Sequence, residues 1–294
     1  MVCVPKPVAC LLATCLLGGE IRIHSQHNCA PSPSFDMRPD HTPFVRANLV
    51  SVPRVNSSGL SVQSARLAHL EYALGAVPPS LWQQTHLFLE FGVRKGFSIN
   101  HLANITRTFT WHGFDSFNGL PPATSSDATR RSIHWNSGTY STHGRLPLVL
   151  PNVQLHAGWF NETVYAFLGS VEGQGAPLAF AHFDADLYDS TATVLTLLAR
   201  SCRLRVGSVL AFDELFGSPA VEQHEWRALN DVARRWGLQF RFLSYMAHEK
   251  TAFGRAAVQL THVEDRCARN AMVPNGWAPK APTKLMFNHK ALST

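Results

Sequence analysis

Residues 182–188 read His-Phe-Asp-Ala-Asp-Leu-Tyr, and residues 212–214 read Phe-Asp-Glu, about one βαβ unit later. In each stretch the acids come directly after a short apolar run that is typical of a buried strand. The first run is Ala176–Phe183 and the second is Val206–Phe212. Because the carboxyl ends of adjacent parallel strands meet at one edge of a sheet, we expect these carboxylates to converge on the crevice where open α/β sheets bind ligands. Converging carboxylates repel one another, and a hard divalent cation with oxygen ligands is the simplest compensation.

The same alternation of apolar runs and helical periods extends on both sides of these stretches. We expect further strands at residues 86–91, 108–114, 153–156, 240–245 and 256–260. We expect helices at residues 62–72, 98–105, 163–168, 191–200 and 222–236, the fourth of them capped by Ser190 or Thr191. This order predicts an α/β protein with a doubly wound, mostly parallel, Rossmann-like sheet.

Length and composition predict one domain with extensions. The chain has 294 residues, of which 45% are hydrophobic, enough for a sizeable core. Residues from about 20 to 60 are rich in Pro, Ser, Asn and Arg and show no apolar period. We therefore expect an N-terminal extension over residues 1–60, a domain over residues 61–264 and an irregular tail over residues 265–294.

Charge and cysteine content argue against several classes of protein. The net charge is +6, but the basic residues are scattered and form no Lys/Arg-rich run with interleaved aromatics, so we expect no nucleic-acid partner. The six cysteines include no CxxC pair and predict neither a disulfide framework nor a zinc site. We interpret Cys202 and Cys267 as thiols.

The N-terminus carries an apolar run, Val8–Leu17, preceded by Lys6. This run is similar to the core of a signal peptide and is too short to span a bilayer. No clear cleavage site follows it, so we expect a cytoplasmic protein, with secretory or organelle targeting as the alternative. No other segment indicates a membrane span.

A glycine-containing block, Glu90–Ser98, stands where the first strand of the alternation turns into a helix. Gly92 and Gly96 permit a tight turn and a close approach of the backbone to a ligand. Asp115, at the end of the next strand, stands where an acid binds ribose hydroxyls. A plain tight connection is the alternative, and the spacing departs from the G-x-G-x-x-G fingerprint of nicotinamide enzymes.

Six blocks of this sequence resemble, in the same order, those of one enzyme family. The blocks are Glu90–Ser98, Gly113–Pro121, Gly138–Tyr140 with Gly144 and Pro147, Gly158–Thr163, Asp184–Thr191 and Asp213-Glu214. They are similar to the class I S-adenosylmethionine-dependent O-methyltransferases of the macrocin O-methyltransferase type. The resemblance runs from about Leu81 to Leu260 and implies the class I methyltransferase fold.

The resemblance implies a binding site for S-adenosylmethionine. The residues it assigns to that cofactor are Glu90, Gly92, Gly96, Ser98, Asp115, Ser116, Gly158, Trp159, Phe160 and Asp184. Of these, Gly158, Trp159 and Phe160 would lie beside the adenine.

The resemblance also implies magnesium, held by Asp184, Asp213 and Glu214, and a general base at Asp186. The relatives carry Asp-Asp where this chain has Asp213-Glu214, and the longer Glu still reaches a cation. In methyl transfer the acceptor oxygen lies in line with the methyl carbon, a cation lowers the pKa of the hydroxyl, and a carboxylate takes its proton. Helix capping is the alternative role for Asp184 and Asp186, although residues 189–191 already supply candidate caps.

Two further segments have open interpretations. The polar insert at residues 122–147, which carries Trp135 and Tyr140, is either a lid over the acceptor or a plain surface loop. His224-Glu225-Trp226 is interpreted as a packed helix start that could border the acceptor site.

The sequence favours a small-molecule O-methyltransferase, and two other classes remain. A metal-dependent glycosyltransferase would use Asp184-Ala185-Asp186 to clamp a nucleotide sugar, but it leaves Glu90–Ser98 and Asp115 unexplained. A catalytically silent, methyltransferase-like binding protein would not need converging carboxylates. We expect a small-molecule hydroxyl acceptor, such as a sugar or natural product, and no membrane partner. The sequence leaves a homo-oligomer open.

Overall fold

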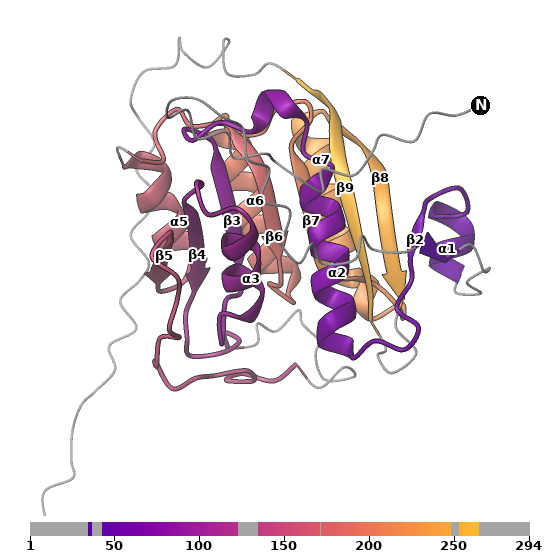
Figure 1. Cartoon of the computed structure of the whole chain (residues 1–294), viewed down its shortest axis with the longest axis horizontal. Helices are drawn as coiled ribbons and strands as arrows, with labels where there is room; N and C mark the ends of the chain where they lie inside the picture. The colour runs from indigo at the N-terminus through magenta and orange to yellow at the C-terminus, as the bar shows by residue number, and fades with distance from the viewer. Residues whose placement is uncertain (1–34, 37–42, 123–134, 171, 248–252, 265–294) are drawn as a thin grey trace, which may run out of the picture. The chain divides into compact units, whose positions relative to one another are not determined.

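The computed structural model describes residues 35–36, 43–122, 135–170, 172–247 and 253–264. A mixed, mostly parallel sheet with helices on both faces forms its centre (Figure 1). The strands are β1 (Phe35–Asp36), β2 (Arg54–Val55), β3 (Leu87–Phe91), β4 (Trp111–Asp115), β5 (Val153–Ala157), β6 (Leu178–Phe183), β7 (Val209–Phe216), β8 (Leu238–Ala247) and β9 (Gly254–Val263). The helices are α1 (Pro43–Asn48), α2 (Val62–Gly75), α3 (Phe97–Ile105), α5 (Phe160–Gly169), α6 (Tyr188–Arg200) and α7 (Glu225–Trp236), with the 3-10 turns η1 (Pro79–Leu81) and η2 (Val221–Gln223).

The strand order identifies the fold. The strands lie in the order β1-β2-β8-β9-β7-β6-β3-β4-β5. From β5 to β7 all neighbours are parallel, whereas β9 runs antiparallel between β7 and β8. A parallel sheet that reverses at β3 and carries one inserted antiparallel strand near its end has the class I methyltransferase arrangement. The predicted doubly wound, Rossmann-like sheet is therefore confirmed.

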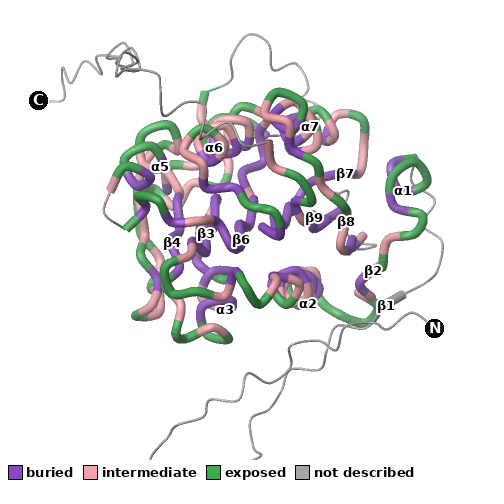
Figure 2. Tube along the Cα trace, turned by 90° about the horizontal axis from the view of Figure 1, so that it is seen from above, coloured by how far each residue is buried: buried purple, intermediate pink, exposed green. Residues whose placement is uncertain are grey.

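Helices cover the sheet in two layers, with α2 and α3 on one face and α5, α6 and α7 on the other (Figure 2). Each layer has its own apolar core, represented by Leu70 and Leu102 on the first face and by Leu195 and Leu229 on the second. Every residue of β3, β6 and β7 is buried, because both faces of these strands are covered. This double covering explains the continuous apolar runs in the sequence.

Part of the predicted N-terminal extension packs on the core. Phe44, Val45 and Leu49, in or just after α1, are buried. The Phe44 ring stacks on Phe216 with centroids 5.0 Å apart and meets the edge of Trp226 at the same distance. The sequence shows no apolar period here because the contact needs only one helix of six residues.

The predicted cap of α6 is wrong. The helix begins at Tyr188, so Ser190 and Thr191 lie inside it, and its N-cap residue Leu187 makes no side-chain cap. Instead, the backbone N–H of Tyr188 donates to Nδ1 of His224 at 3.3 Å. A side chain from the start of α7 therefore replaces the local cap.

Cys202 is disulfide-bonded, so its interpretation as a thiol is wrong. The apolar run Val8–Leu17 and the tail at residues 265–294 lie outside the described residues. Of the helices within the described ranges, none has both the length and the hydropathy that a bilayer crossing requires.

Candidate functional site

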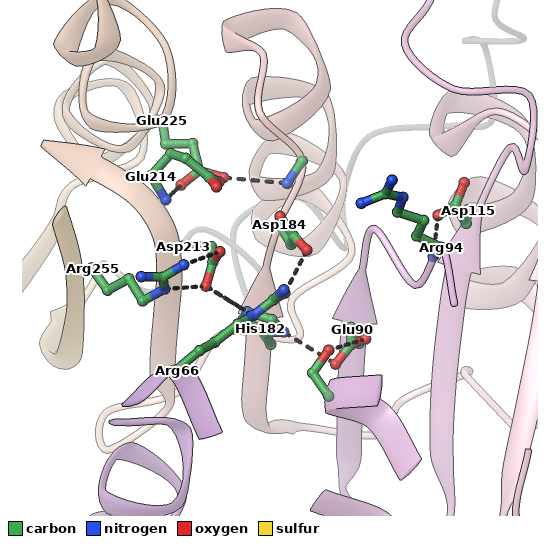
Figure 3. A network of polar contacts seen from close by, with 12 residues as sticks. Arg66, Glu90, Arg94, Asp115, His182, Asp184, Asp213, Glu214, Glu225 and Arg255 are labelled. Carbon is green, nitrogen blue, oxygen red and sulfur yellow. Dashed lines mark hydrogen bonds and ion pairs between the residues drawn. The ribbon is translucent and has the colours of Figure 1, made fainter. Parts of the chain in front are cut away.

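The predicted acids gather at one edge of the sheet. In the ladder, Phe91 is level with Phe114 and Phe183, and Phe183 is level with Phe212. An aspartate directly follows Phe114, Phe183 and Phe212, so three aspartates lie at the same level of the sheet (Figure 3). Asp115 ends β4, Asp184 follows the end of β6, and Asp213 lies within β7. The expected convergence of the acids is confirmed for the strand ends.

Asp213 is compensated by an arginine that sequence reasoning missed. Arg255, near the start of β9, donates from Nε to Asp213 Oδ1 at 2.7 Å and from Nη2 to Asp213 Oδ2 at 3.0 Å. The antiparallel pairing of Phe212 with Ala256 sets these two side chains side by side. Burial alone would raise the pKa of the Asp213 carboxyl, but Arg255 and Arg66 hold this pKa well below its ordinary value.

Arg66, on α2, is the second missed arginine, and it joins two of the predicted acids. Its Nη2 donates to Asp184 Oδ2 at 2.5 Å, and its Nε lies 3.1 Å from Asp213 Oδ1 (Figure 3). Burial opposes its charge, but Asp184 and Asp213 outweigh burial and raise the pKa of the guanidinium. A partner 118 residues away in the chain leaves no local signal in the sequence.

His182 links this group to the glycine block. Its Nδ1 lies 3.1 Å from Glu90 Oε2, and its Nε2 lies 3.8 Å from Asp213 Oδ1. The other oxygen of Glu90 accepts from Ser98 Oγ at 2.9 Å, and Glu90 is fully buried. Glu90 and Ser98 thus tie the first turn of α3 to the sheet. Burial would lower the pKa of His182, but the nearby carboxylates of Asp213 and Glu90 raise it to about 9.

Asp186, the predicted base, is buried and has a left-handed backbone with φ of 57°. An L-residue in this region is uncommon, although Asp tolerates it better than most. Burial and then the neighbouring Asp184 raise the pKa of the Asp186 carboxyl well above its ordinary value. Neither Asp184 nor Asp186 caps α6, so capping does not explain them.

Glu225, the first residue of α7, joins the loop after β6 to strand β7. Its Oε1 accepts from the N–H of Ala185 at 3.3 Å, and its Oε2 accepts from the N–H of Glu214 at 3.1 Å. Burial raises the pKa of Glu225 to about 8. The expectation of a packed helix start at residues 224–226 is confirmed, and the bonds from Glu225 add a positioning role.

We call the carboxyl groups of this region, with their cationic partners, the acidic cluster. Among the described residues its carboxyl groups are Glu90, Asp184, Asp186, Asp213, Glu214 and Glu225, and its cationic side chains are Arg66, His182 and Arg255. Three cations offset three of the six carboxylates. The remaining carboxyls must bind protons or a further cation, because a buried charge without a partner is unfavourable.

Asp184, Asp213 and Glu214 fit a divalent cation by residue type and spacing. One oxygen from each lies within 4.8 Å of the other two. Glu214 Oε2 is buried and has no hydrogen-bond partner among the described residues. Burial and then Asp213 raise the pKa of Glu214 well above its ordinary value, as expected for a carboxyl that needs a cation or a proton.

The glycine block turns tightly against β6. Gly92 has φ of 95°, and a Cβ atom there would lie 1.9 Å from the carbonyl oxygen of Asp184, so only glycine fits. Gly96 has a left-handed backbone and is the N-cap residue of α3. The structure thus realises the tight connection that the sequence offered as an alternative, and it leaves the first turn of α3 facing the same edge of the sheet.

Asp115 is held by the backbone rather than by arginine. Its Oδ2 accepts from the N–H of Arg94 and its Oδ1 from the N–H of Phe117, both at 2.7 Å. Burial raises its pKa, and these N–H groups oppose the rise. Next to it, Ser116 Oγ donates to the carbonyl oxygen of Gly119 at 3.1 Å.

The block from Gly158 to Phe160 divides between site edge and core. The N–H of Gly158 donates to the carbonyl oxygen of Asp115 at 2.9 Å. Trp159 is 38% exposed beside this contact, whereas the Phe160 ring packs edge-on against Phe91 in the core. Trp159 is therefore the member of this block that is free to meet a ligand.

The described end of the insert lies against the acidic cluster. Trp135 is buried against Leu187, and its ring centroid lies 5.1 Å from that of His224. The guanidinium carbon of Arg94 lies 4.9 Å from the centre of the Tyr140 ring. Burial and then Asp186 raise the pKa of Tyr140 to about 12. The remainder of the insert, residues 123–134, lies outside the described residues.

This chain has only low similarity to known proteins in sequence and in structure. No family model and no curated protein matches the sequence. Among solved structures, the calicheamicin methyltransferase CalS11 is 23% identical, with a TM-score of 0.46 over 67% of this chain and 77% of that one. An apo structure of CalS11, described as a TDP-rhamnose 3'-O-methyltransferase, is 24% identical, with a TM-score of 0.39 over 65% and 79%. The methyltransferase PaMTH1 of Podospora anserina, bound to SAH, is 14% identical, with a TM-score of 0.35 over 60% and 71%. The fold therefore rests on the strand order itself.

Proposed function

We propose that this protein is an S-adenosylmethionine-dependent methyltransferase that methylates a hydroxyl group of a small molecule. The observation that carries the proposal is the placement of Asp115, Asp184 and Asp213 along one edge of a sheet with the class I methyltransferase strand order. Open α/β sheets bind ligands at this edge. The surplus of carboxyl groups fits a cofactor whose sulfur carries a positive charge.

On the donor side, Asp115 would bind the ribose hydroxyls and Trp159 would lie beside the adenine. The Asp115 carboxylate is already oriented by the N–H groups of Arg94 and Phe117. The hydrogen bond between Ser98 and Glu90 holds the first turn of α3 against β3. Bound S-adenosylmethionine supplies an activated methyl group.

On the acceptor side, Asp186 would take the hydroxyl proton as the oxygen forms its bond to the methyl carbon. The cofactor would release the methyl group by cleavage of its carbon–sulfur bond and would leave as a neutral thioether. Asp184, Asp213 and Glu214 would hold magnesium, which supplies a lower hydroxyl pKa when bound. Glu225 fixes the loop after β6, which carries Asp184 and Asp186, against strand β7, which carries Asp213 and Glu214.

A ligand screen followed by a transfer assay tests the proposal. S-adenosylmethionine should raise the melting temperature of the protein, whereas nucleotide sugars should not. Hydroxyl acceptors, beginning with sugars, should then become methylated, and a chelator should lower turnover while leaving cofactor affinity unchanged. Stabilisation by a nucleotide sugar alone would favour a metal-dependent glycosyltransferase. Binding of S-adenosylmethionine without transfer to any acceptor, including those in a broad hydroxyl library, would favour a silent binding protein.

A further inference from the structure

Arg66 stands inside the proposed cation site. We propose that Arg66 is a built-in competitor of the divalent cation, which neutralises Asp184 and Asp213 in the cation-free protein and must release them when a cation binds. This inference rests on the cation site of the proposed function and adds a residue of α2 to it. It concerns cation binding, which can be measured without cofactor or acceptor.

The contacts define what Arg66 blocks. Its guanidinium binds oxygens of Asp184 and Asp213, at 2.5 and 3.1 Å, and these are two of the three predicted ligands. The three ligand oxygens lie within 4.8 Å of one another, so a cation among them would lie beside the guanidinium. Two positive groups at such a distance repel strongly at a site removed from water. The arginine and the cation therefore exclude each other from the shared carboxylates.

Glu214 shows that the site is incomplete with Arg66 alone. Its Oε2 atom is buried without a hydrogen-bond partner among the described residues, and Glu214 belongs to the same set of three candidate ligands. A buried carboxylate oxygen without a donor carries a desolvation penalty. A cation that displaces Arg66 would use this oxygen as well as those of Asp184 and Asp213.

Arg66, rather than Arg255, is suited to move. Arg255 makes a two-pronged contact with Asp213 alone, is anchored in β9 and has a side chain only 7% exposed. Arg66 extends from a helix on the face of the sheet, and its side chain is 17% exposed. Release of Arg66 would still leave Asp213 paired with Arg255. The protein can thus release the Arg66 guanidinium from the acidic cluster while Arg255 stays bound to Asp213.

The inference is tested by titrating the full-length protein with manganese or magnesium in a calorimeter, in the absence of cofactor. Arg66→Gln removes the competing charge and should bind the cation at least roughly tenfold more tightly than the unaltered protein. Arg66→Lys keeps the charge and should bind the cation more weakly than Arg66→Gln does. Glu71→Ala, which removes the contact of α2 with His101 at 2.5 Å, controls for general loosening of the helix and should change nothing.

Equal or weaker cation affinity in Arg66→Gln would overturn the inference, as would the absence of binding in every variant. A variant that simply loosened the site would lose affinity rather than gain it. If Arg66→Gln folds poorly because Asp184 and Asp213 are left in excess, magnesium should raise its melting temperature more than that of the unaltered protein. Failure of magnesium to do so would also count against the inference. Loss of methyl transfer with tighter cation binding would contradict only the proposed function.

Discussion

Asp115 and Asp213 are acids at the same edge of one sheet, but the protein holds them in different ways. Asp115 accepts two backbone N–H groups, from residues 21 and 2 positions away in the chain. Asp213 instead meets the side chains of Arg255 and Arg66, which come from β9 and α2. The edge therefore has a donor side held by backbone N–H groups and an acceptor side held by charge pairs between side chains.

This difference gives each side its own electrostatics. Backbone N–H groups orient the Asp115 carboxylate without adding a full charge, so it remains able to bind neutral hydroxyls. The acceptor side contains full charges of both signs, which affect one another through a medium of low polarity. His182, in contact with both Glu90 and Asp213, is the residue that connects the two sides.

The largest effect is expected where the acceptor side does its chemistry. Asp186→Asn should reduce the rate of methyl transfer by roughly 10²–10⁴, the usual contribution of a general base, and leave cofactor affinity unchanged. Asp189→Asn, an exposed acid in the first turn of α6, is the control and should keep the rate. Single-turnover assays with saturating cofactor measure both.

The pH dependence of that rate gives a second check on Asp186. Because burial and Asp184 raise the pKa of this carboxyl, the base is increasingly protonated as pH falls, and the rate should rise with pH. In Asp186→Asn this titration is absent, and the deficit should shrink at high pH, where the acceptor ionises unaided. A rate within a few-fold of the unaltered enzyme would remove Asp186 from the base role.

The buried charge pairs of the acceptor side should also dominate stability. Arg255→Leu leaves Asp213 with only Arg66, and the free energy of unfolding should fall by about 3–5 kcal/mol, as when one partner of a buried pair is removed. The matched control is Arg234→Leu, whose 2.5 Å contact with Asp231 is mostly exposed and contributes less than about 1 kcal/mol. Urea denaturation gives both values. Similar losses in the two variants would erase the contrast between buried and exposed pairs.

The two sides were also unequally predictable from sequence. The common level of Asp115, Asp184 and Asp213 followed from apolar runs, since the position of a side chain along a strand is a local property, although β7 continues past Asp213 to Phe216. Arg66 and Arg255 carry no such signal, because they meet the acids only after α2 folds onto the sheet and β9 inserts beside β7. The cap of α6 was missed for the same reason, since it comes from His224 in another element. Periodicity thus predicted the scaffold, whereas charge compensation depends on tertiary contacts.

The protonation of His182, which connects the two sides, should make the free energy of unfolding depend on pH. Its pKa in the folded protein is raised from 6.5 to about 9, so its contribution to stability is fully present below pH 6.5 and is lost as pH rises through 9. Glu225, whose pKa is raised to about 8, changes stability in the same direction. The free energy of unfolding should therefore fall by on the order of 5 kcal/mol between pH 6.5 and about pH 9.5. His182→Gln should flatten this decline, and an unchanged slope in that variant would place the titration elsewhere.

The smallest effect is expected on the donor side. Asp115→Ala removes a carboxylate that would accept ribose hydroxyls, and S-adenosylmethionine should bind more weakly by about 1–3 kcal/mol, the usual size of a lost charged hydrogen bond. Glu172→Ala, at an exposed acid beyond the end of α5, provides the control and should bind the cofactor normally. Calorimetry without acceptor measures the binding free energy of the cofactor separately from any effect on acceptor binding. Because the Asp115 side chain is held by backbone N–H groups and not by the charged side chains of the acidic cluster, its removal should leave the cation affinity of the acceptor side unchanged. A change there would mean that the two sides of the edge are coupled through Glu90 and His182.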